Sequence, residues 1–274
     1  MGLALPASLT DPRQVWRLVV QYDGRAFHGF QRQPNGITVQ SSLEDSLSTL
    51  FDERIIIHGS GRTDAGVHAL GQVVSFRSAA ERVPYRVRMG LNTMLPRELS
   101  VVECALAPSQ FHARFSASGK TYRYRILNRR DRCPFHEGFA MHVRYPLDWA
   151  AIELGLSSLV GTHDYSTFRG AGCNTKTSIR TIDRAVHLGL GDEHHLEFHG
   201  NGFLRYQVRK MVGTLVEVGA GKRAAADVAL ALAARDPARA GKTAYPTGLF
   251  LVSVDYPAEA LFDWVATSGS EAAD

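Results

Sequence analysis

The sequence predicts an α+β fold built as two halves. Its 274 residues, 45% of them hydrophobic, are enough for either one large domain or two of ordinary size. Segments with the two-residue alternation of strands are interspersed with segments of helical periodicity along the chain. We predict a first half over residues 13–110 and a second half over residues 111–264. The small, polar and acidic segment 265–274 is predicted to be a disordered tail.

The expected order of elements in the first half is strand, helix, strand, strand, helix, strand, which resembles a ferredoxin-like unit. Val15–Tyr22 alternates between an apolar and a mixed face, so it is expected as a strand. Thr38 can cap a helix through about Phe51, because apolar residues recur there at helical spacing. The other elements are expected as strands at Ile55–Ile57, Gly71–Phe76 and Val101–Leu106, and as a helix near Tyr85–Met94.

The first strand expected in the second half is Lys120–Leu127. Alternation places Tyr122 and Tyr124 on one face of this strand and Arg123 and Arg125 on the other. We interpret Tyr124 as an ordinary core residue. The later elements are expected as helices at Trp149–Val160, from about Arg205 to Val218 and at Ala224–Arg235, and as strands near Ile179–Leu188, His195–His199 and Leu249–Asp255.

The positive charge is concentrated in the middle of the chain. The net charge of +4 and the pI near 9.0 are only mildly basic. Between Arg114 and Arg132, however, seven basic residues accompany a single acid, Asp131. Such a run is typical of a protein that follows a phosphate backbone, and the alternative is a solvated face with no partner.

Composition and motifs argue against several other classes. No segment approaches the roughly 20 apolar residues that span a bilayer, and the chain start lacks a basic segment before an apolar run, so a cytoplasmic location is expected. The three cysteines, Cys104, Cys133 and Cys173, are far apart and predict neither a disulfide framework nor a zinc cluster. The sequence also contains no phosphate-binding loop and no convergent set of metal ligands. We therefore predict no metal site and no cofactor.

The most informative segment runs from Gly59 to His68 and reads Gly-Ser-Gly-Arg-Thr-Asp-Ala-Gly-Val-His. Its three glycines surround one guanidinium group, Arg62, and one carboxylate, Asp64. Glycine allows positive φ angles and close approach to a ligand, so such a loop can present Asp64 to an open site. The alternative is that Asp64 only forms a turn.

This segment resembles the catalytic motif of the TruA family of tRNA pseudouridine synthases. The resemblance extends, in family order, from about residue 16 to residue 256. The further matching blocks are Tyr22-Asp23-Gly24 through Gln33, Phe111 to Ser116, Lys120 to Tyr124, Asn201 to Arg209 and Gly248 to Leu251. Three places depart from the family pattern: Phe30, the run Arg205-Tyr206-Gln207 and the run Tyr245-Pro246-Thr247.

The resemblance implies a fold, a substrate and an assembly. The fold is the pseudouridine synthase fold, in which two ferredoxin-like, RRM-like halves share an extended and mainly antiparallel sheet with a central basic cleft. The substrate is the anticodon stem-loop of tRNA, modified at uridines 38, 39 and 40. The enzyme is expected to be a homodimer that uses no cofactor and no metal and has no contact with membranes.

The resemblance also assigns roles to five residues. Asp64 is the catalytic carboxylate, and Arg209 pairs with it, with a solvent-facing helix arginine as the alternative for Arg209. Tyr122 stacks on the uracil that leaves the RNA stack. Arg62 contacts a phosphate or a base, with a structural hydrogen-bonding role as the alternative. Leu249 lines the pocket, with ordinary strand packing as the alternative.

The reaction itself requires only a positioned carboxylate. Isomerising uridine breaks the glycosidic C–N bond and joins the same ribose to carbon 5 of uracil, with no oxidation and no added group. Asp64 can attack the sugar, attack the base or assist glycal formation by removing a proton, and these alternatives stay open. Two other classes compete: a non-catalytic RNA-binding module, and a phosphate-ester hydrolase that would need a metal and further acids near Asp64.

Overall fold

The computed structural model describes residues 13–173 and 175–261 of the chain. The predicted tail and the chain start lie outside the described residues. The strands are β1 (Gln14–Tyr22), β2 (His58–Gly59), β3 (His68–Ser78), β4 (Leu99–Ala107), β5 (Gly119–Asn128), β6 (Met141–Val143), β7 (Gly161–Asp164), β8 (Ile179–Leu190), β9 (Glu193–Gly200) and β10 (Leu249–Asp255). The helices are α1 (Val39–Phe51), α2 (Pro84–Met94), α3 (Trp149–Ser157), α4 (Gln207–Gly219), α5 (Ala226–Ala234) and α6 (Ala258–Leu261).

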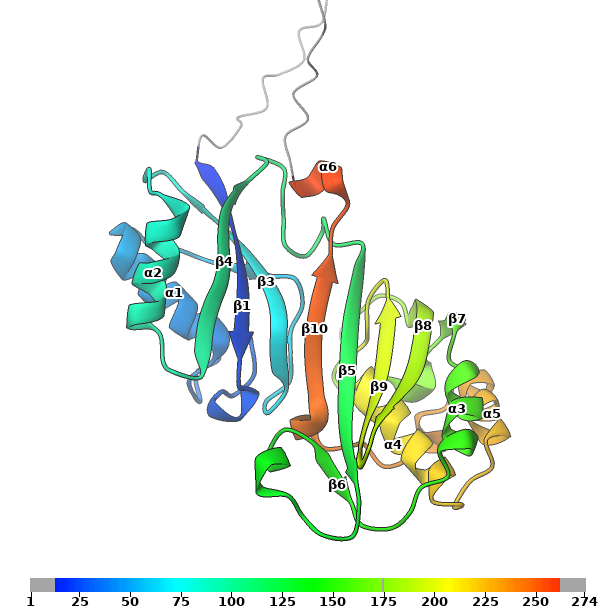
Figure 1. Cartoon of the computed structure of the whole chain (residues 1–274). Helices are drawn as coiled ribbons and strands as arrows, with labels where there is room; N and C mark the ends of the chain where they lie inside the picture. Colours follow the sequence, from blue (N-terminus) through cyan, green and yellow to red (C-terminus); the bar gives the residue numbers. More distant parts are fainter. Residues whose placement is uncertain (1–12, 174, 262–274) are drawn as a thin grey trace, which may run out of the picture.

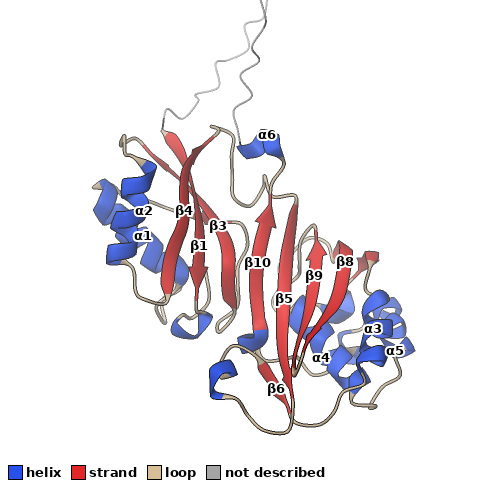
Figure 2. Cartoon of the chain, viewed as in Figure 1, coloured by secondary structure: helices blue, strands red, loops and turns tan. Residues whose placement is uncertain are grey.

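All ten strands found in the described residues belong to one open sheet, with the order β4-β1-β3-β10-β5-β9-β8-β7 and with β2 on β3 and β6 on β5. Neighbouring strands are antiparallel except for β10 with β3 and β6 with β5. Helices α1 and α2 lie beside the β4 end of the sheet, and α3, α4 and α5 lie beside the β7 end (Figure 2). The predicted α+β class with a shared, mainly antiparallel sheet is confirmed.

The last strand joins the two ends of the sheet. β10 lies between β3 and β5 in the middle of the sheet (Figure 1). It pairs in parallel with β3 through Phe250 and His68, and antiparallel with β5 through Leu251 and Tyr122. A strand from late in the sequence, β10, therefore lies directly beside β3 of the first half. The proposed boundary at residue 110 and the predicted basic cleft stay predictions.

Local sequence signals explain why the first elements form. Trp16, Leu18 and Val20 of β1 are fully buried, as the alternation predicts. The hydroxyl of Thr38 accepts a hydrogen bond from the backbone of Ser41, whose side chain in turn caps Thr38, which forms a capping box at the start of α1. The helix predicted from Thr38 to Phe51 is thus confirmed.

The strand predicted at Ile55–Ile57 is wrong. Ile55 and Ile57 are buried and Ile56 is 54% exposed, so the apolar alternation is real. The backbone N–H groups of Ile55 and Ile57 nevertheless donate to side chains of α1, namely Ser48 at 3.0 Å and Glu44 at 3.2 Å. Because side chains of α1 accept these N–H groups, they are not available to a neighbouring strand. Strand pairing therefore begins only at β2, which pairs with β3.

Candidate active site

Asp64 is the first residue of a tight turn. The N–H of Val67 donates to the carbonyl of Asp64 at 3.1 Å, and Gly66 has a φ of 78°. A side chain at Gly66 would be strained in this conformation, and its Cβ would lie 3.0 Å from Pro246. The glycine is therefore required by both the turn and the close packing of residue 246.

Buried polar side chains support the segment before this turn. The hydroxyls of Tyr22 and Thr63 are 2.8 Å apart, and the N–H of Phe30 donates to the carbonyl of Thr63 at 3.1 Å. Gln72, fully buried on β3, accepts from the hydroxyl of Ser60 at 2.7 Å and donates to the carbonyl of Gly61 at 3.0 Å. These bonds fix the loop from both sides. Gln72 could not be predicted from the sequence, since nothing in an apolar strand shows that a single amide bridges to a loop.

Lys120 also supports the loop, so its ammonium group is not available to bind a phosphate. Its Nζ donates to the carbonyl of Ser60 at 2.7 Å. Burial, with smaller effects from Arg114 and Arg180, lowers the pKa of Lys120 to about 8. This ammonium group is thus a partly buried cation directly behind the loop that carries Asp64.

Asp64 and Arg209 lie together although 145 positions separate them in the chain. Nη1 of Arg209 is 3.3 Å from Oδ2 of Asp64, and the two side chains are 14% and 25% exposed. Burial raises the pKa of Asp64, while the positive charges of Arg209 and Arg205 act in the opposite direction. Nε of Arg209 donates to the carbonyl of Ala244 at 2.9 Å, so the guanidinium is also fixed by backbone.

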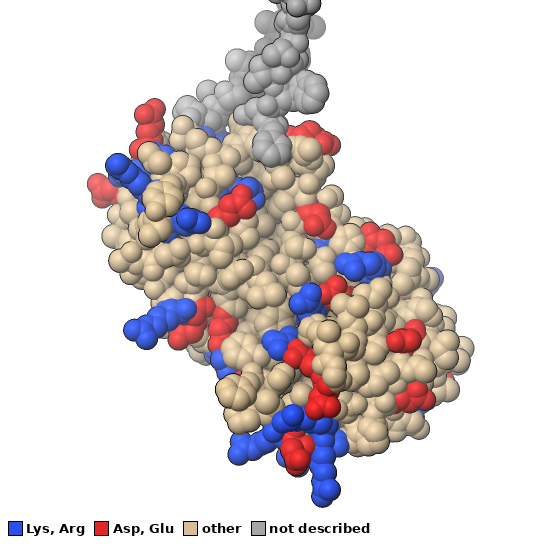
Figure 3. All heavy atoms as spheres, in the orientation of Figure 1, with Lys and Arg blue, Asp and Glu red and all other residues tan. Residues whose placement is uncertain are grey.

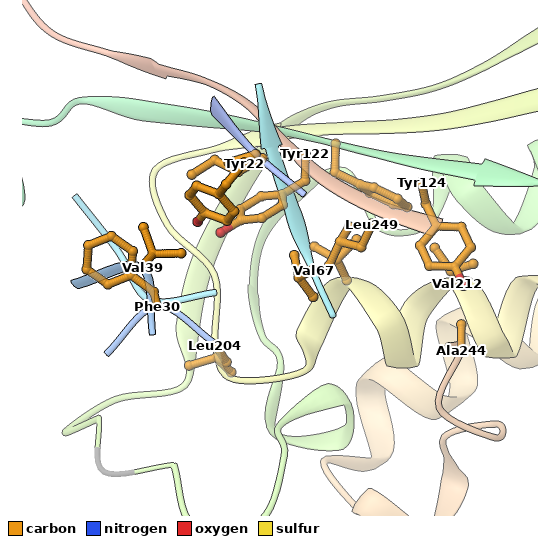
Figure 4. Packing of buried hydrophobic residues seen from close by; sticks show 14 of the residues in the cluster. Tyr22, Phe30, Val39, Val67, Tyr122, Tyr124, Leu204, Val212, Ala244 and Leu249 are labelled. Carbon is orange, nitrogen blue, oxygen red and sulfur yellow. The ribbon is translucent and has the colours of Figure 1, made fainter. Parts of the chain in front are cut away.

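Tyr122 interacts electrostatically with Asp64. Burial raises the pKa of its hydroxyl above the ordinary value, and the charges of Tyr22 and Asp64 add to the rise. Its ring packs edge-on against Phe203, with 5.1 Å between the ring centroids. Figure 4 shows the rings of Tyr22 and Tyr122 together in the buried cluster, with Leu249 on the neighbouring strand.

Leu249 and Tyr124 are both core residues by burial. Leu249 is 5% exposed and pairs in the sheet with Tyr124, which is fully buried. The hydroxyl of Tyr124 donates to the carbonyl of Tyr245 at 2.7 Å. The interpretation of Tyr124 as core is confirmed, and the burial of Leu249 is compatible with both of its predicted roles.

Arg62 lies on the outer side of the same loop. Its side chain is exposed, and it takes part in none of the hydrogen bonds or ion pairs found among the described residues. A structural hydrogen-bonding role therefore has no support in the described part of the chain. The exposed guanidinium is free to contact a ligand.

The basic run between Arg114 and Arg132 is less available to phosphate than its sequence predicts. Arg123 binds Glu197 and Arg125 binds Glu193, each at 2.6 Å. On the face seen in Figure 3, Lys and Arg side chains are interspersed with Asp and Glu side chains and form no continuous basic surface. Both acids come from β9, which pairs with β5, and Glu197 lies directly opposite Arg123 in the register.

Within residues 13–173 and 175–261, no group of three or more His, Cys, Asp or Glu side chains has an arrangement that could hold a metal ion. No helix in the same ranges is long and apolar enough to cross a membrane.

Comparison with known proteins relates the chain to a family. A family profile described as tRNA pseudouridine synthase matches residues 18–116 and 156–257. The chain is 43% identical over 252 residues to a tRNA pseudouridine synthase A of Levilactobacillus brevis, an alignment that covers 90% of this chain and 95% of the relative. It is 46% identical over 233 residues to a protein of the same name from Halalkalibacterium halodurans, covering 85% of this chain and 89% of the relative.

A third relative, from Rhizorhabdus wittichii, has the same name and is 41% identical over 245 residues, which is 89% of this chain and 96% of the relative. The family match and these relatives, together with the open mixed sheet, define an isomerase that acts on tRNA. The chain belongs to the family of tRNA pseudouridine synthases, which convert uridine to pseudouridine in tRNA.

Proposed function

We propose that this enzyme forms pseudouridine at positions 38, 39 and 40 of the tRNA anticodon stem-loop and that Asp64 is its catalytic carboxylate. The observation that carries the proposal is the pairing of Asp64 with Arg209 at 3.3 Å, with Tyr122 near enough for the charge of Asp64 to act on its hydroxyl. The reaction needs a positioned carboxylate, which the counter-charge keeps ionised, and an aromatic ring can hold the extruded base by stacking.

The geometry supports a reactive carboxylate oxygen. Arg209 engages Oδ2 of Asp64, and no hydrogen bond found among the described residues engages Oδ1. The guanidinium favours the ionised form of Asp64 against the effect of burial. Oδ1 can therefore face the nucleotide, whether it attacks the sugar, attacks the base or removes the proton that forms a glycal.

The remaining residues hold the substrate. The ring of Tyr122 stacks on the extruded uracil, and Leu249 forms the apolar wall beside it. Arg62, exposed next to Asp64, contacts a phosphate or base of the same nucleotide or its neighbour. Within the same proposal, the enzyme acts in the cytoplasm as a homodimer and uses no cofactor.

The test uses tRNA that carries tritium at carbon 5 of uracil. Joining carbon 5 to the ribose expels the hydrogen at that carbon, so each turnover releases one tritium into water. Three transcripts, each with a single uridine retained at position 38, 39 or 40 and cytidine at the other two, locate the target. We expect release from all three and none from a transcript with cytidine at all three positions.

Two outcomes would contradict the proposal. Release from the transcript without uridine at these positions would move the target elsewhere in tRNA. Tight tRNA binding without release from any transcript would favour the non-catalytic RNA-binding module. Light scattering of the purified protein tests the homodimer, since a mass near 30.1 kDa would show a monomer.

A further inference from the structure

Tyr206, the residue just before α4, has an unusual backbone conformation. Its φ of 62° and ψ of 1° lie in the left-handed region, which bulky side chains rarely adopt. The other non-glycine residues with positive φ in the described ranges, Asp52 and Arg235, follow the ends of α1 and α5, where this conformation is common. Tyr206 instead lies immediately before the start of α4. The conformation of the other two residues is explained by their place at the end of a helix, and this explanation does not apply to Tyr206.

Hydrogen bonds on both sides hold Tyr206 in this conformation. The N–H of Gly170 donates to the carbonyl of Arg205 at 2.8 Å, and the N–H of Lys210 donates to the carbonyl of Tyr206 at 2.9 Å. The buried side chain of Gln207 accepts from the N–H of Leu204 at 2.8 Å. The surrounding structure thus imposes a conformation that the residue itself disfavours, a feature that clusters at functional sites.

The conformation brings the Tyr206 ring to two arginines. The guanidinium carbon of Arg209 lies 4.9 Å from the ring centroid, and that of Arg205 lies 4.7 Å from it. Nη2 of Arg205 also donates to the hydroxyl of Tyr206 at 3.0 Å. Both distances are within the range of cation–π attraction.

The space for the ring depends on Gly170. A Cβ at this position would lie 2.6 Å from the Tyr206 ring and 2.9 Å from the carbonyl of Arg205. The neighbouring loop therefore fits against the ring without a side chain between them. The ring is therefore held between Gly170 of this loop and Arg209 of α4.

We propose that Tyr206 is a positioning residue of the isomerisation, because its ring orients the guanidinium of Arg209 toward Asp64 and keeps Arg205 nearby as a second cation. This inference rests on the proposed role of Asp64. It also gives a function to the run Arg205-Tyr206-Gln207, where the chain departs from the usual family pattern.

The electrostatics of Asp64 agree with this role. The charged groups that act on its carboxylate are Arg209 and Arg205, and Tyr122 is the titratable neighbour that responds to it. Both cations contact the same ring. Removing the ring frees both guanidinium groups, so the pKa of Asp64 should rise and the acidic limb of the rate profile should move to higher pH.

The experiment compares single-turnover tritium release against pH for wild type, Tyr206→Phe, Tyr206→Leu and Tyr206→Gly. Tyr206→Phe keeps the ring and should stay within about threefold of wild type. Tyr206→Leu and Tyr206→Gly should be slower by roughly tenfold, the size expected from losing a partly desolvated cation–π contact. The affinity of these variants for tRNA should change by only a few-fold, because the task assigned to Arg209 is to keep Asp64 ionised and oriented and not to bind RNA.

Tyr206→Gly separates positioning from folding. Glycine adopts the left-handed conformation without strain, so this variant should unfold at a temperature close to that of wild type and still react slowly. Asp52→Gly, which makes the same change at the end of α1 and away from Asp64, is the matched control and should keep the wild-type rate.

The outcomes distinguish this inference from the proposed function. Wild-type rates for Tyr206→Leu and Tyr206→Gly at every pH, with Asp64→Asn inactive, would overturn the positioning role and leave the role of Asp64 intact. A loss for Tyr206→Phe as large as that for Tyr206→Leu would also overturn it, since the hydroxyl and not the ring would then be responsible. Activity of Asp64→Asn would instead remove the proposed function on which the inference rests.

Discussion

Arg209 contacts Asp64 through one nitrogen and one oxygen, 3.3 Å apart. This contact is longer than the usual ion-pair hydrogen bond and is not the two-bond fork that arginine can form with a carboxylate. A second guanidinium nitrogen, Nε, donates to the carbonyl of Ala244 at 2.9 Å. Arg209 is thus oriented by backbone as well as by charge, and half of the Asp64 carboxylate stays available.

The first prediction concerns the removal of this counter-charge. Arg209→Ala leaves a partly buried carboxylate without its partner, so the pKa of Asp64 should rise further above its ordinary value. The ionised form is the reactive one, and activity should therefore be lost at a higher pH as the solution is acidified. At neutral pH the single-turnover rate should fall roughly 10²-fold, as for the loss of one preorganised electrostatic group.

Arg209→Lys is the matched variant for this prediction. Lysine restores the charge without the planar guanidinium, so it cannot donate to Asp64 and Ala244 in the same geometry. Its rate should lie between those of wild type and Arg209→Ala. Equal pH profiles for wild type and Arg209→Ala would show that the pairing has no part in catalysis.

A second prediction separates free from paired arginines in RNA binding. Arg62 is exposed without a partner among the described residues, whereas Arg123 binds Glu197 at 2.6 Å. Arg62→Gln should reduce the slope of log affinity against log salt by about one, because one phosphate contact is lost. Arg123→Gln should leave the slope unchanged.

The measurement is tRNA affinity between roughly 50 and 200 mM salt, a range over which phosphate contacts weaken strongly. Equal slopes for wild type and Arg62→Gln would show that Arg62 does not contact phosphate. A reduced slope for Arg123→Gln would restore the phosphate-binding role that the sequence assigned to the whole basic run.

The third prediction concerns stability and Lys120. Its pKa is about 8 in the folded protein and 10.5 in the reference state, so between these values the unfolded chain binds the additional proton. Stability contributed by this group should therefore increase with pH over that window, by up to about 1.4 kcal/mol per pH unit. Lys120→Met lacks the titration and serves as the control.

Urea unfolding at pH 7 and at pH 10 measures the effect. The free energy of unfolding of wild type, relative to that of Lys120→Met, should be higher at pH 10 than at pH 7. An unchanged difference would mean that the ammonium group is solvated and does not lie behind the Asp64 loop.

Much of the fold could be predicted from local sequence. The strand that was predicted wrongly depends on contacts between distant parts of the chain. The strand at β1 and the helix after Thr38 were predicted because period and capping are local properties. The strand at Ile55–Ile57 was not formed because side chains of α1 take its backbone donors. A contact of this kind depends on tertiary packing, and an apolar triplet alone does not reveal it.

The site shows the same division. The glycines around Asp64 were enough to predict the loop. Its pairing with Arg209, 145 positions away, could be predicted only from the family resemblance. Gln72 and Lys120 were not predicted as supports, because a polar group within a strand gives no sign of the loop that it reaches. The backbone of Tyr206 had no sequence signal either, since aromatic residues seldom adopt positive φ.

The most direct test of the account is tritium release by Asp64→Asn. The amide keeps the size of the side chain and can still accept a hydrogen bond from Arg209, but it cannot act as a nucleophile or base. The variant should bind tRNA within a few-fold of wild type and release no tritium in a single turnover from tRNA labelled at carbon 5 of uracil. Release at a substantial fraction of the wild-type rate would contradict the central claim that Asp64 is the catalytic carboxylate.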